Sequence, residues 1–244
     1  MIVLFTDFGV AGPYVGQLRA VLARQAPATP VIELFSDAPA CDPKAAAYLL
    51  AAYVGEFPVG TVFLGVVDPG VGGRRKAGIL FAGGRWFVGP DNGLFEIVVR
   101  RAQETPRWRE LAVAADGISA TFHGRDVFAP AAALLACGAM PDGRDQPFAA
   151  MRRPAWPDDL AEVIYIDGFG NAMTGLRADR VAAATGLIVG GVHLARARTF
   201  SDVPERAAFC YQNANGLIEI AVNQGRASER LGLKVGTPVE IAGM

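Results

Sequence analysis

The chain has 244 residues and a formal net charge of −1, and 52% of its residues are hydrophobic. This length fits one large domain or two smaller ones, and the apolar content is sufficient for a substantial core. The near-neutral charge offers no cationic surplus to a nucleic-acid backbone, and no apolar run approaches the roughly 20 residues needed to span a bilayer.

The first half of the chain alternates apolar runs with segments that have helical spacing. Five runs predict strands, at residues 2–6, 30–34, 61–67, 77–82 and 85–89, the last two as a hairpin. Three segments predict helices, at residues 14–27, 42–57 and 123–138. In the second helix, Asp42 is the expected N-cap and Pro43 fits the first turn. Residues 94–102 fit either a helix or a strand.

This alternation predicts an α/β domain with a mainly parallel sheet and helices on both faces, over residues 1–150. Residues 152–159 contain two prolines and four charges, which indicates a linker that we place at 151–160. Short apolar runs separated by Gly and Asn follow it and predict a small β-barrel or sandwich over residues 161–244.

The cysteines and the N-terminus indicate the compartment. Cys41, Cys137 and Cys210 are far apart and include no CxxC pair, so reduced, isolated thiols are expected instead of a zinc site. The N-terminus "MIVLFTDFG" has no basic region and reaches Asp7 early, unlike a signal peptide. We therefore expect a cytoplasmic protein with neither a membrane nor a nucleic acid as partner.

Polar clusters follow several of the apolar runs. Asp7 follows the first strand, and Asp68, Arg74 and Arg75 follow the strand at 61–67. Parallel strands present ligand-binding loops at their carboxyl ends, so Asp7 and Asp68 are expected at one edge of the sheet. Charges there must face water, a partner or a ligand, because unpaired burial is costly.

Each cluster also has a purely structural interpretation. Asp7 could cap a helix, and "DPG" and "PDNG" are common turn sequences. His193 alternates with apolar residues and fits a structural role. Composition and spacing leave two functions open. One is a metal hydrolase with Asp7, Asp68, Asp91 and His123 as ligands, and the other is an adenosine-type binder in which Asp7 holds the ribose diol. The absence of HxH, HxxxH and DxD counts mildly against a metal.

Taken in order, the motifs resemble those of the S-adenosyl-L-methionine hydrolases, also called hydroxide adenosyltransferases, which are relatives of fluorinase and chlorinase. The matching segments extend over nearly the whole chain and are "TDFG", "YVG", "VVDPGVG", "PDNG", "FHGRDVFAPAAA", "YIDGFGN" and "GLIEIAVNQGRASERLGL". The combination of "DPGVG", "FHGRD" and "FGN" is far more specific than any one of them.

The resemblance implies a Rossmann-like N-terminal domain and a C-terminal β-barrel. It also implies a homotrimer, in which each active site lies between the N-terminal domain of one subunit and the C-terminal domain of its neighbour. The implied reaction uses S-adenosyl-L-methionine as substrate, with no cofactor and no metal. Water or hydroxide attacks the ribose 5′ carbon, and adenosine and L-methionine are formed.

The resemblance also implies the catalytic residues. Asp68, Arg75 and His123 would form a hydrogen-bonded triad that binds and activates water, with Arg74 outside the site. His123 could take a proton near neutral pH. The halogenating relatives have a Tyr at the position of Asp68 and a halide-holding Ser at that of Gly124, and they lack the His. This sequence therefore favours water as the nucleophile.

The substrate-binding residues implied by the resemblance come from both halves of the chain. Asp7 would accept the ribose hydroxyls, and Asp167 would meet the methionine ammonium group. The adenine contacts and the carboxylate loop would be supplied by Phe169, Asn171, Phe200 and Asn213.

Two positions depart from the family pattern, Gly12 in place of an Asp and Ala214 in place of a Ser. Both would have contacted the methionine portion, at about 1–3 kcal/mol each. The alternatives to hydrolysis of S-adenosyl-L-methionine are therefore a non-catalytic adenosine or S-adenosylmethionine sensor and a hydrolase of a related adenosyl compound.

Overall fold

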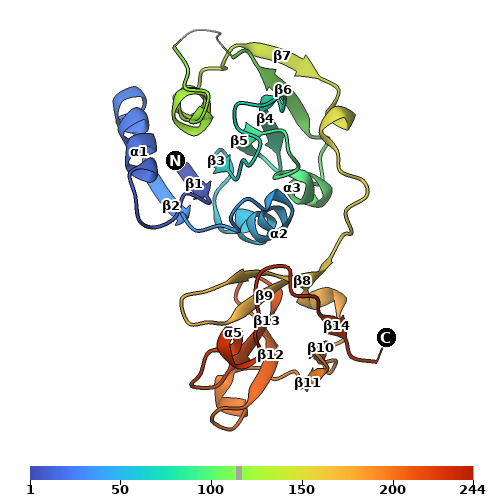
Figure 1. Cartoon of the computed structure of the whole chain (residues 1–244). Coiled ribbons are helices and arrows are strands. Elements are labelled where there is room, and N and C mark those ends of the chain that lie inside the picture. The colour runs from blue at the N-terminus through green and yellow to red at the C-terminus, as the bar shows by residue number, and fades with distance from the viewer. Residues whose placement is uncertain (114–116, 244) are drawn as a thin grey trace. The chain divides into compact units, whose positions relative to one another are not determined.

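The computed structural model describes residues 1–113 and 117–243. The chain divides into two compact units, Met1–Trp156 and Pro157–Met244. The first is a sheet flanked by helices, and the second consists mostly of short strands (Figure 1). Within the described ranges, no helix is both long and apolar enough to cross a membrane.

The first unit contains a seven-stranded sheet with the order β2-β1-β3-β5-β4-β6-β7. Its strands are β1 (Ile2–Thr6), β2 (Val31–Phe35), β3 (Val62–Val66), β4 (Ala77–Ala82), β5 (Arg85–Pro90), β6 (Arg107–Leu111) and β7 (Gly143–Gln146). β1 pairs parallel with β2 and β3, and β3 pairs parallel with β5. β4 pairs antiparallel with β5 and β6, and β7 pairs antiparallel with β6. Five of these strands therefore run in one direction, which confirms the mainly parallel sheet.

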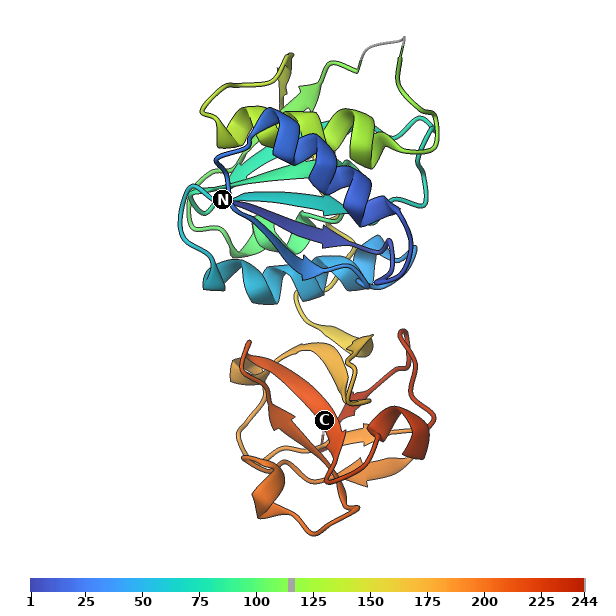
Figure 2. The same cartoon turned by 90° about the vertical axis from the view of Figure 1, so that its left-hand side faces the viewer.

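Helices cover both faces of this sheet (Figure 2). α1 (Tyr14–Gln25) and α4 (Ala129–Ala136) lie on one face, and α2 (Pro43–Tyr53) and α3 (Glu96–Arg101) lie on the other. Asp42 caps α2 as the sequence predicts, because its Oδ1 accepts from the Ala45 N–H at 2.9 Å. β1 and β3 are buried along their whole length, as expected for strands covered on both faces.

The strand order determines where a ligand site can lie. The chain leaves β1 toward β2 on one side and returns to β3 on the other, so the order reverses at β1 and β3. In open α/β sheets, such a reversal opens a crevice beyond the carboxyl ends of the strands. Asp7 follows β1 at this edge, and its N–H donates to the Val66 carbonyl at 3.3 Å. Asp68 comes two residues after the end of β3.

The strands β6 and β7 are absent from the sequence prediction. Their sequences, RWREL and GRDQ, lack apolar alternation because these strands lie toward one edge of the sheet and are only partly buried. Residues 94–102, which fit either element, contain the helix α3.

The second unit contains two antiparallel sheets, of orders β12-β13-β9-β8 and β11-β10-β14. Its elements are β8 (Leu160–Ile166), β9 (Ala172–Arg177), β10 (Leu187–Val189), β11 (Val192–Leu194), β12 (Ala208–Gln212), β13 (Leu217–Val222), α5 (Ala227–Arg230) and β14 (Glu240–Ile241). Apolar side chains from both sheets form one core that includes Val163, Leu187 and Ile220. The pairings give separate sheets, so closure into a barrel stays a prediction.

The beginning of the segment expected to be a linker contacts the first unit. Arg152 Nη2 lies 3.0 Å from Oε1 of Glu96, and the backbone N–H of Arg153 donates to Glu96 Oε2 at 2.9 Å. Arg100 Nε donates to the same carboxylate at 2.7 Å. The Glu96 side chain is fully buried, so residues 152 and 153 help to hold a buried charge at the start of α3 (Glu96–Arg101).

Candidate active site

The loop between β3 and β4 brings Arg75 back onto Asp68. Two successive turns, from the Val71 N–H to the Asp68 carbonyl and from the Gly73 N–H to the Gly70 carbonyl, fold the loop. Arg75 Nε donates to both oxygens of Asp68 at 2.9 and 3.0 Å, and Nη2 donates to Oδ2 at 2.5 Å. The side chains are 11% and 4% exposed, so this is a nearly buried, charge-assisted pair.

The same guanidinium reaches His123. Arg75 Nη2 lies 2.8 Å from His123 Nδ1, although the two residues are 48 positions apart. Gly72 permits this approach, because its φ is +75° and a Cβ there would lie 2.4 Å from the Ala120 carbonyl oxygen. A larger residue at 72 would force the loop away from the segment that carries His123.

His123 precedes an irregular helical turn. Residues Gly124–Phe128 form a π-helical turn that continues into α4, a deviation often found at functional sites. The ring of Phe128 lies under the Arg75 guanidinium, with 5.2 Å between Cζ and the ring centroid. The guanidinium is therefore fixed by a carboxylate, an imidazole and an aromatic face.

The environment keeps His123 neutral. Burial and the Arg75 charge lower the pKa of His123 below its ordinary value of 6.5, and the Asp68 and Asp126 carboxylates offset this only in part. A guanidinium in a protein does not give up its proton, so Arg75 is the donor to Nδ1. In the neutral ring the proton is therefore on Nε2.

Asp7 lies at the same edge as this cluster. Its Oδ2 accepts from the Cys41 N–H at 2.9 Å. Burial raises the pKa of Asp7, and the nearby Asp68 charge adds to the effect, although the hydrogen bond from Cys41 opposes it. An aspartate at the end of β1 is suited to accept hydrogen bonds from a diol.

Aromatic rings border the cluster. Phe8, Tyr14 and Phe122 contact one another with centroids 5.4–5.8 Å apart. Gly124 packs beneath them, since a Cβ there would lie 3.1 Å from Phe8 Cζ and 3.3 Å from Phe122 Cε2. The position next to His123 therefore has little room for a side chain.

In the second unit, Asp167, Phe169 and Asn171 belong to one turn between β8 and β9. Asp167 Oδ1 accepts from the N–H groups of Phe169 and Asn171, both at 2.9 Å, and its Oδ2 accepts from Asn171 Nδ2 at 3.3 Å. Asn171 is buried, whereas Phe169 is 79% exposed. The turn thus exposes the Phe169 ring and holds the Asp167 carboxylate with its own N–H groups.

Phe200 and Asn213 adjoin a second polar group. The Phe200 ring is edge-on to Phe209 and to Tyr211, at 5.1 and 5.4 Å between centroids. Asn213 is buried, and its Nδ2 donates to Glu219 Oε2 at 2.9 Å. Neither Tyr211 nor Glu219 is among the residues predicted from the sequence. The signal for Glu219 is a single charge within the apolar run "GLIEIAV".

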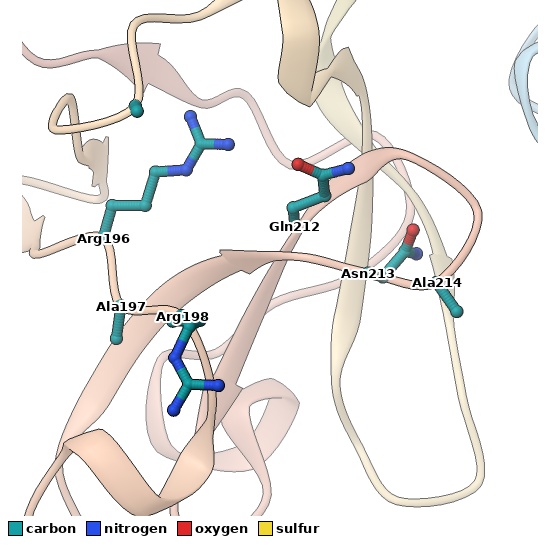
Figure 3. Close-up of a pocket in the computed structure, with 7 residues that line it drawn as sticks. Arg196, Ala197, Arg198, Gln212, Asn213 and Ala214 are labelled. Carbon is teal, nitrogen blue, oxygen red and sulfur yellow. The ribbon is translucent and has the colours of Figure 1, made fainter.

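Asn213 and Ala214 also line an open cavity of about 570 Å³ in this unit, together with Arg196, Arg198 and Gln212 (Figure 3). The Arg196 and Gln212 side chains extend in a similar direction, and Arg198 points the other way. Arg196 donates to the carbonyls of residues 178, 181 and 182. Ala214 is part of this lining and offers the cavity no side-chain hydrogen-bonding group.

The structure therefore brings Asp68, Arg75 and His123 into direct contact, with Asp7 near Asp68. Asp91, the remaining member of the metal set considered from the sequence, pairs with Arg153 at 3.1 Å. Among residues 1–113 and 117–243, no three His, Cys, Asp or Glu side chains are arranged as metal ligands. Asp167, Phe169, Asn171, Phe200 and Asn213 all lie in the second unit.

Family models match both halves of the chain. Residues 2–144 match the SAM hydroxide adenosyltransferase N-terminal domain, and residues 161–240 match the C-terminal domain of the same family. A Thermus thermophilus protein named (R)-S-adenosyl-L-methionine hydrolase is 45% identical over 252 residues, which cover 97% of each chain. A protein of the same name from Salinispora arenicola is 38% identical over 97% of this chain and 95% of its own length.

Solved structures share the fold. The crystal structure of an uncharacterised conserved protein from Thermotoga maritima superposes with a TM-score of 0.83, at 31% identity and 99% coverage of both chains. A conserved hypothetical protein from Thermus thermophilus gives a TM-score of 0.79, at 40% identity and 98% coverage of both.

Proposed function

Because this chain belongs to the SAM hydroxide adenosyltransferase family, we propose that it hydrolyses (R)-S-adenosyl-L-methionine to adenosine and L-methionine. Its relatives from Thermus thermophilus and Salinispora arenicola, matched over nearly their whole length, are named for that activity. Within the structure, the observation that supports the proposal most is the continuous contact from Asp68 through Arg75 to His123, just beyond β3.

The reaction makes its main demand on the nucleophile. An oxygen of water attacks the ribose 5′ carbon, and the carbon–sulfur bond breaks with its electron pair remaining on sulfur. The sulfonium leaves as a neutral thioether, so no acid is required. One proton passes to solvent for each adenosine formed. Free water has a pKa near 15.7 and is a poor nucleophile, so the site must favour its anionic form.

Arg75 supplies the positive charge that this step needs. At about 3 Å and an effective dielectric near 20, a guanidinium attracts a hydroxide by roughly 5–6 kcal/mol. Asp68 orients the guanidinium through three contacts, which allows the remaining N–H groups to face the oxygen. Asp68 is thus a positioning residue in this proposal, and Arg75 is the group that touches the nucleophile.

The hydrogen bond at Nδ1 refines the role expected for His123. With Nδ1 accepting from Arg75, the neutral ring has no free lone pair to take a proton from water. It has instead an N–H at Nε2 that can donate to the attacking oxygen. We therefore assign His123 as a donor that holds hydroxide together with Arg75, while the proton of water is lost to solvent.

The substrate-binding roles follow the family resemblance, and the geometry is compatible with each. Asp7 would hold the ribose diol near the triad. In the second unit, the Phe200 ring and the Asn171 turn would bind adenine, with Phe169 exposed beside it. Asp167 would meet the ammonium group, and the Asn213 loop would hold the carboxylate.

We also propose the assembly that the family resemblance implies. Catalytic residues lie in the first unit and adenine-binding residues in the second, which is compatible with a homotrimer whose sites combine units from neighbouring subunits. The functional division is 1–150 for the Rossmann-like domain, 151–160 for the linker and 161–244 for a domain whose strands close into a barrel. The proposed setting is the cytoplasm, with no nucleic-acid or membrane partner.

The crowding at Gly124 favours water over halide. The halide-holding Ser of the halogenating relatives would place a Cβ within 3.1–3.3 Å of two aromatic rings here. Such contacts are tighter than ordinary van der Waals distances and would displace Phe8 or Phe122. The same position next to His123 is therefore shaped for a glycine and not for a halide ligand.

Product analysis tests the proposal. Purified protein incubated with (R)-S-adenosyl-L-methionine is expected to form adenosine and methionine in equal amounts, also after exhaustive chelation of metals. The expected proton release is one per turnover in an unbuffered assay. Tight binding of the substrate without turnover would support the sensor alternative instead. That alternative is based on Gly12 and Ala214, the two positions that depart from the family pattern.

A further inference from the structure

Glu219 is a buried carboxyl that the proposed reaction does not use. It lies in the middle of β13, where the other residues are apolar, and it is 3% exposed. Burial raises the pKa of Glu219 above its ordinary value of 4.5, and the Asp167 charge adds to this. Burying a carboxyl in an apolar strand is costly, and an apolar residue of similar size would serve stability at least as well. A geometric role accounts better for its presence.

Both oxygens of Glu219 accept hydrogen bonds from side chains of the proposed binding surface. The Tyr211 hydroxyl donates to Oε1 at 2.6 Å, and Asn213 Nδ2 donates to Oε2 at 2.9 Å. Tyr211 lies directly opposite Glu219 in the β12–β13 register, so the first contact is a cross-strand pair. Glu219 thereby connects the end of β12 to the start of β13.

Each of these partners fixes a different part of the proposed binding surface. Tyr211 supports the Phe200 ring from one edge, with centroids 5.4 Å apart and planes at 64°. Asn213 accepts from the N–H groups of Asn215 and Leu217, both at 3.0 Å, and so determines the path of residues 213–217. The Asn213 amide cannot rotate without losing these two bonds.

We propose that Glu219 is a positioning residue that couples the aromatic support for adenine, through Tyr211 and Phe200, to the loop that receives the methionine carboxylate, through Asn213. This inference rests on the proposed function for the identity of the two ligand groups. We call the Tyr211–Phe200 contacts and the Asn213 loop the two arms of this arrangement. The inference predicts that binding at one arm can be weakened without the other, whereas loss of a purely structural hydrogen bond would lower stability without distinguishing the two ligands.

Three substitutions test this role of Glu219. Tyr211→Phe removes the hydroxyl that donates to Oε1 and is expected to weaken adenosine binding about tenfold, with little effect on methionine binding. Glu219→Leu removes both contacts and should weaken both ligands and raise KM about tenfold, with kcat within about threefold of wild type. Glu219→Gln retains both contacts, because its carbonyl can accept from Asn213 and its amide can donate to the tyrosine oxygen. Near-complete recovery is therefore expected.

Thr174→Val is the matched control. Thr174 is buried in the neighbouring strand β9, where its hydroxyl donates to the Ile218 carbonyl at 2.7 Å and accepts from the Leu176 N–H at 3.3 Å. Neither bond involves Glu219, Tyr211, Phe200 or Asn213. The substitution should lower the unfolding midpoint while leaving ligand affinities unchanged. Affinities for adenosine and methionine would be measured by calorimetry, and KM and kcat by product formation.

The outcomes are distinguishable. Unequal losses for Tyr211→Phe and joint losses for Glu219→Leu, with rescue by Gln, support the coupling. Affinities that stay within twofold in both variants overturn it. Affinities that fall in proportion to the unfolding midpoint in every variant, Thr174→Val included, also overturn it. An absence of wild-type turnover would instead contradict the proposed function, and the adenosine affinities would still test the Tyr211 arm.

Discussion

Replacement of His123 tests the proposed chemistry through its two nitrogens. His123→Ala removes the acceptor for Arg75 at 2.8 Å and the N–H proposed to face the nucleophile. Two charge-assisted hydrogen bonds at about 1.5–3 kcal/mol each amount to roughly 3–6 kcal/mol, or about 10²–10⁴ in kcat/KM. His123→Gln carries an amide N–H near the position of Nε2, so it should keep a donor and lose only about tenfold.

The assay is initial-rate formation of adenosine between pH 5 and 9. Since burial and Arg75 lower the pKa of His123 below 6.5, wild-type activity should decline only below that pH, as the ring becomes protonated and its Nδ1–H opposes Arg75. His123→Gln should lack this acidic decline. The exposed His193, the other histidine of the chain, gives the control His193→Ala, for which no change is expected. If the Gln variant is as inactive as the Ala variant, His123 accepts a proton and the donor assignment is wrong.

Three further substitutions have clear expected results. Arg75→Met should reduce kcat/KM by about 10⁴, from the roughly 5–6 kcal/mol of attraction to hydroxide. Arg74→Met, at an exposed neighbour, should leave the rate unchanged, and equal losses in the two variants would place the site elsewhere. Gly124→Ser should lower the free energy of unfolding by about 1–3 kcal/mol through crowding against Phe8, and an unaltered urea midpoint would refute the crowding. The variant should not form halogenated product when chloride is present. Burial alone would raise the pKa of Glu96, but hydrogen bonds from its arginine partners lower it overall. Glu96→Gln should therefore cost about 3–5 kcal/mol at pH 7, with the deficit shrinking as the pH falls through the lowered pKa; a deficit constant down to pH 3 would contradict this.

The sequence was sufficient for the central strands and for the edge at which the aspartates lie. Apolar runs that are buried on both faces, such as β1 and β3, are recognisable without tertiary information, and parallel pairing then places Asp7 and Asp68 together. The edge strands β6 and β7 were missed because partial exposure removes the apolar pattern. The helix α3 was ambiguous because its buried residues 96–99 are consecutive and show neither period.

Contacts between segments that are distant in the sequence cannot be predicted from local sequence patterns. Arg75 and His123 are 48 residues apart, and their meeting depends on the close approach of Gly72 to Ala120, which no local pattern indicates. The expectation of a triad came from the family resemblance and not from spacing. In the same way, the composition of residues 152–159 predicts a linker but does not indicate that Arg152 pairs with the buried Glu96.

The most direct test of the central claim is the fate of solvent oxygen. Wild-type protein would convert (R)-S-adenosyl-L-methionine in ¹⁸O-labelled water, and the products would be analysed by mass spectrometry. Attack at the ribose 5′ carbon predicts one labelled oxygen in adenosine, at the 5′ position, and none in methionine. Unlabelled adenosine would mean that its 5′ oxygen comes from a source other than water, and 5′-methylthioadenosine with label in the amino-acid product would place the attack at another atom. Either result would contradict the account.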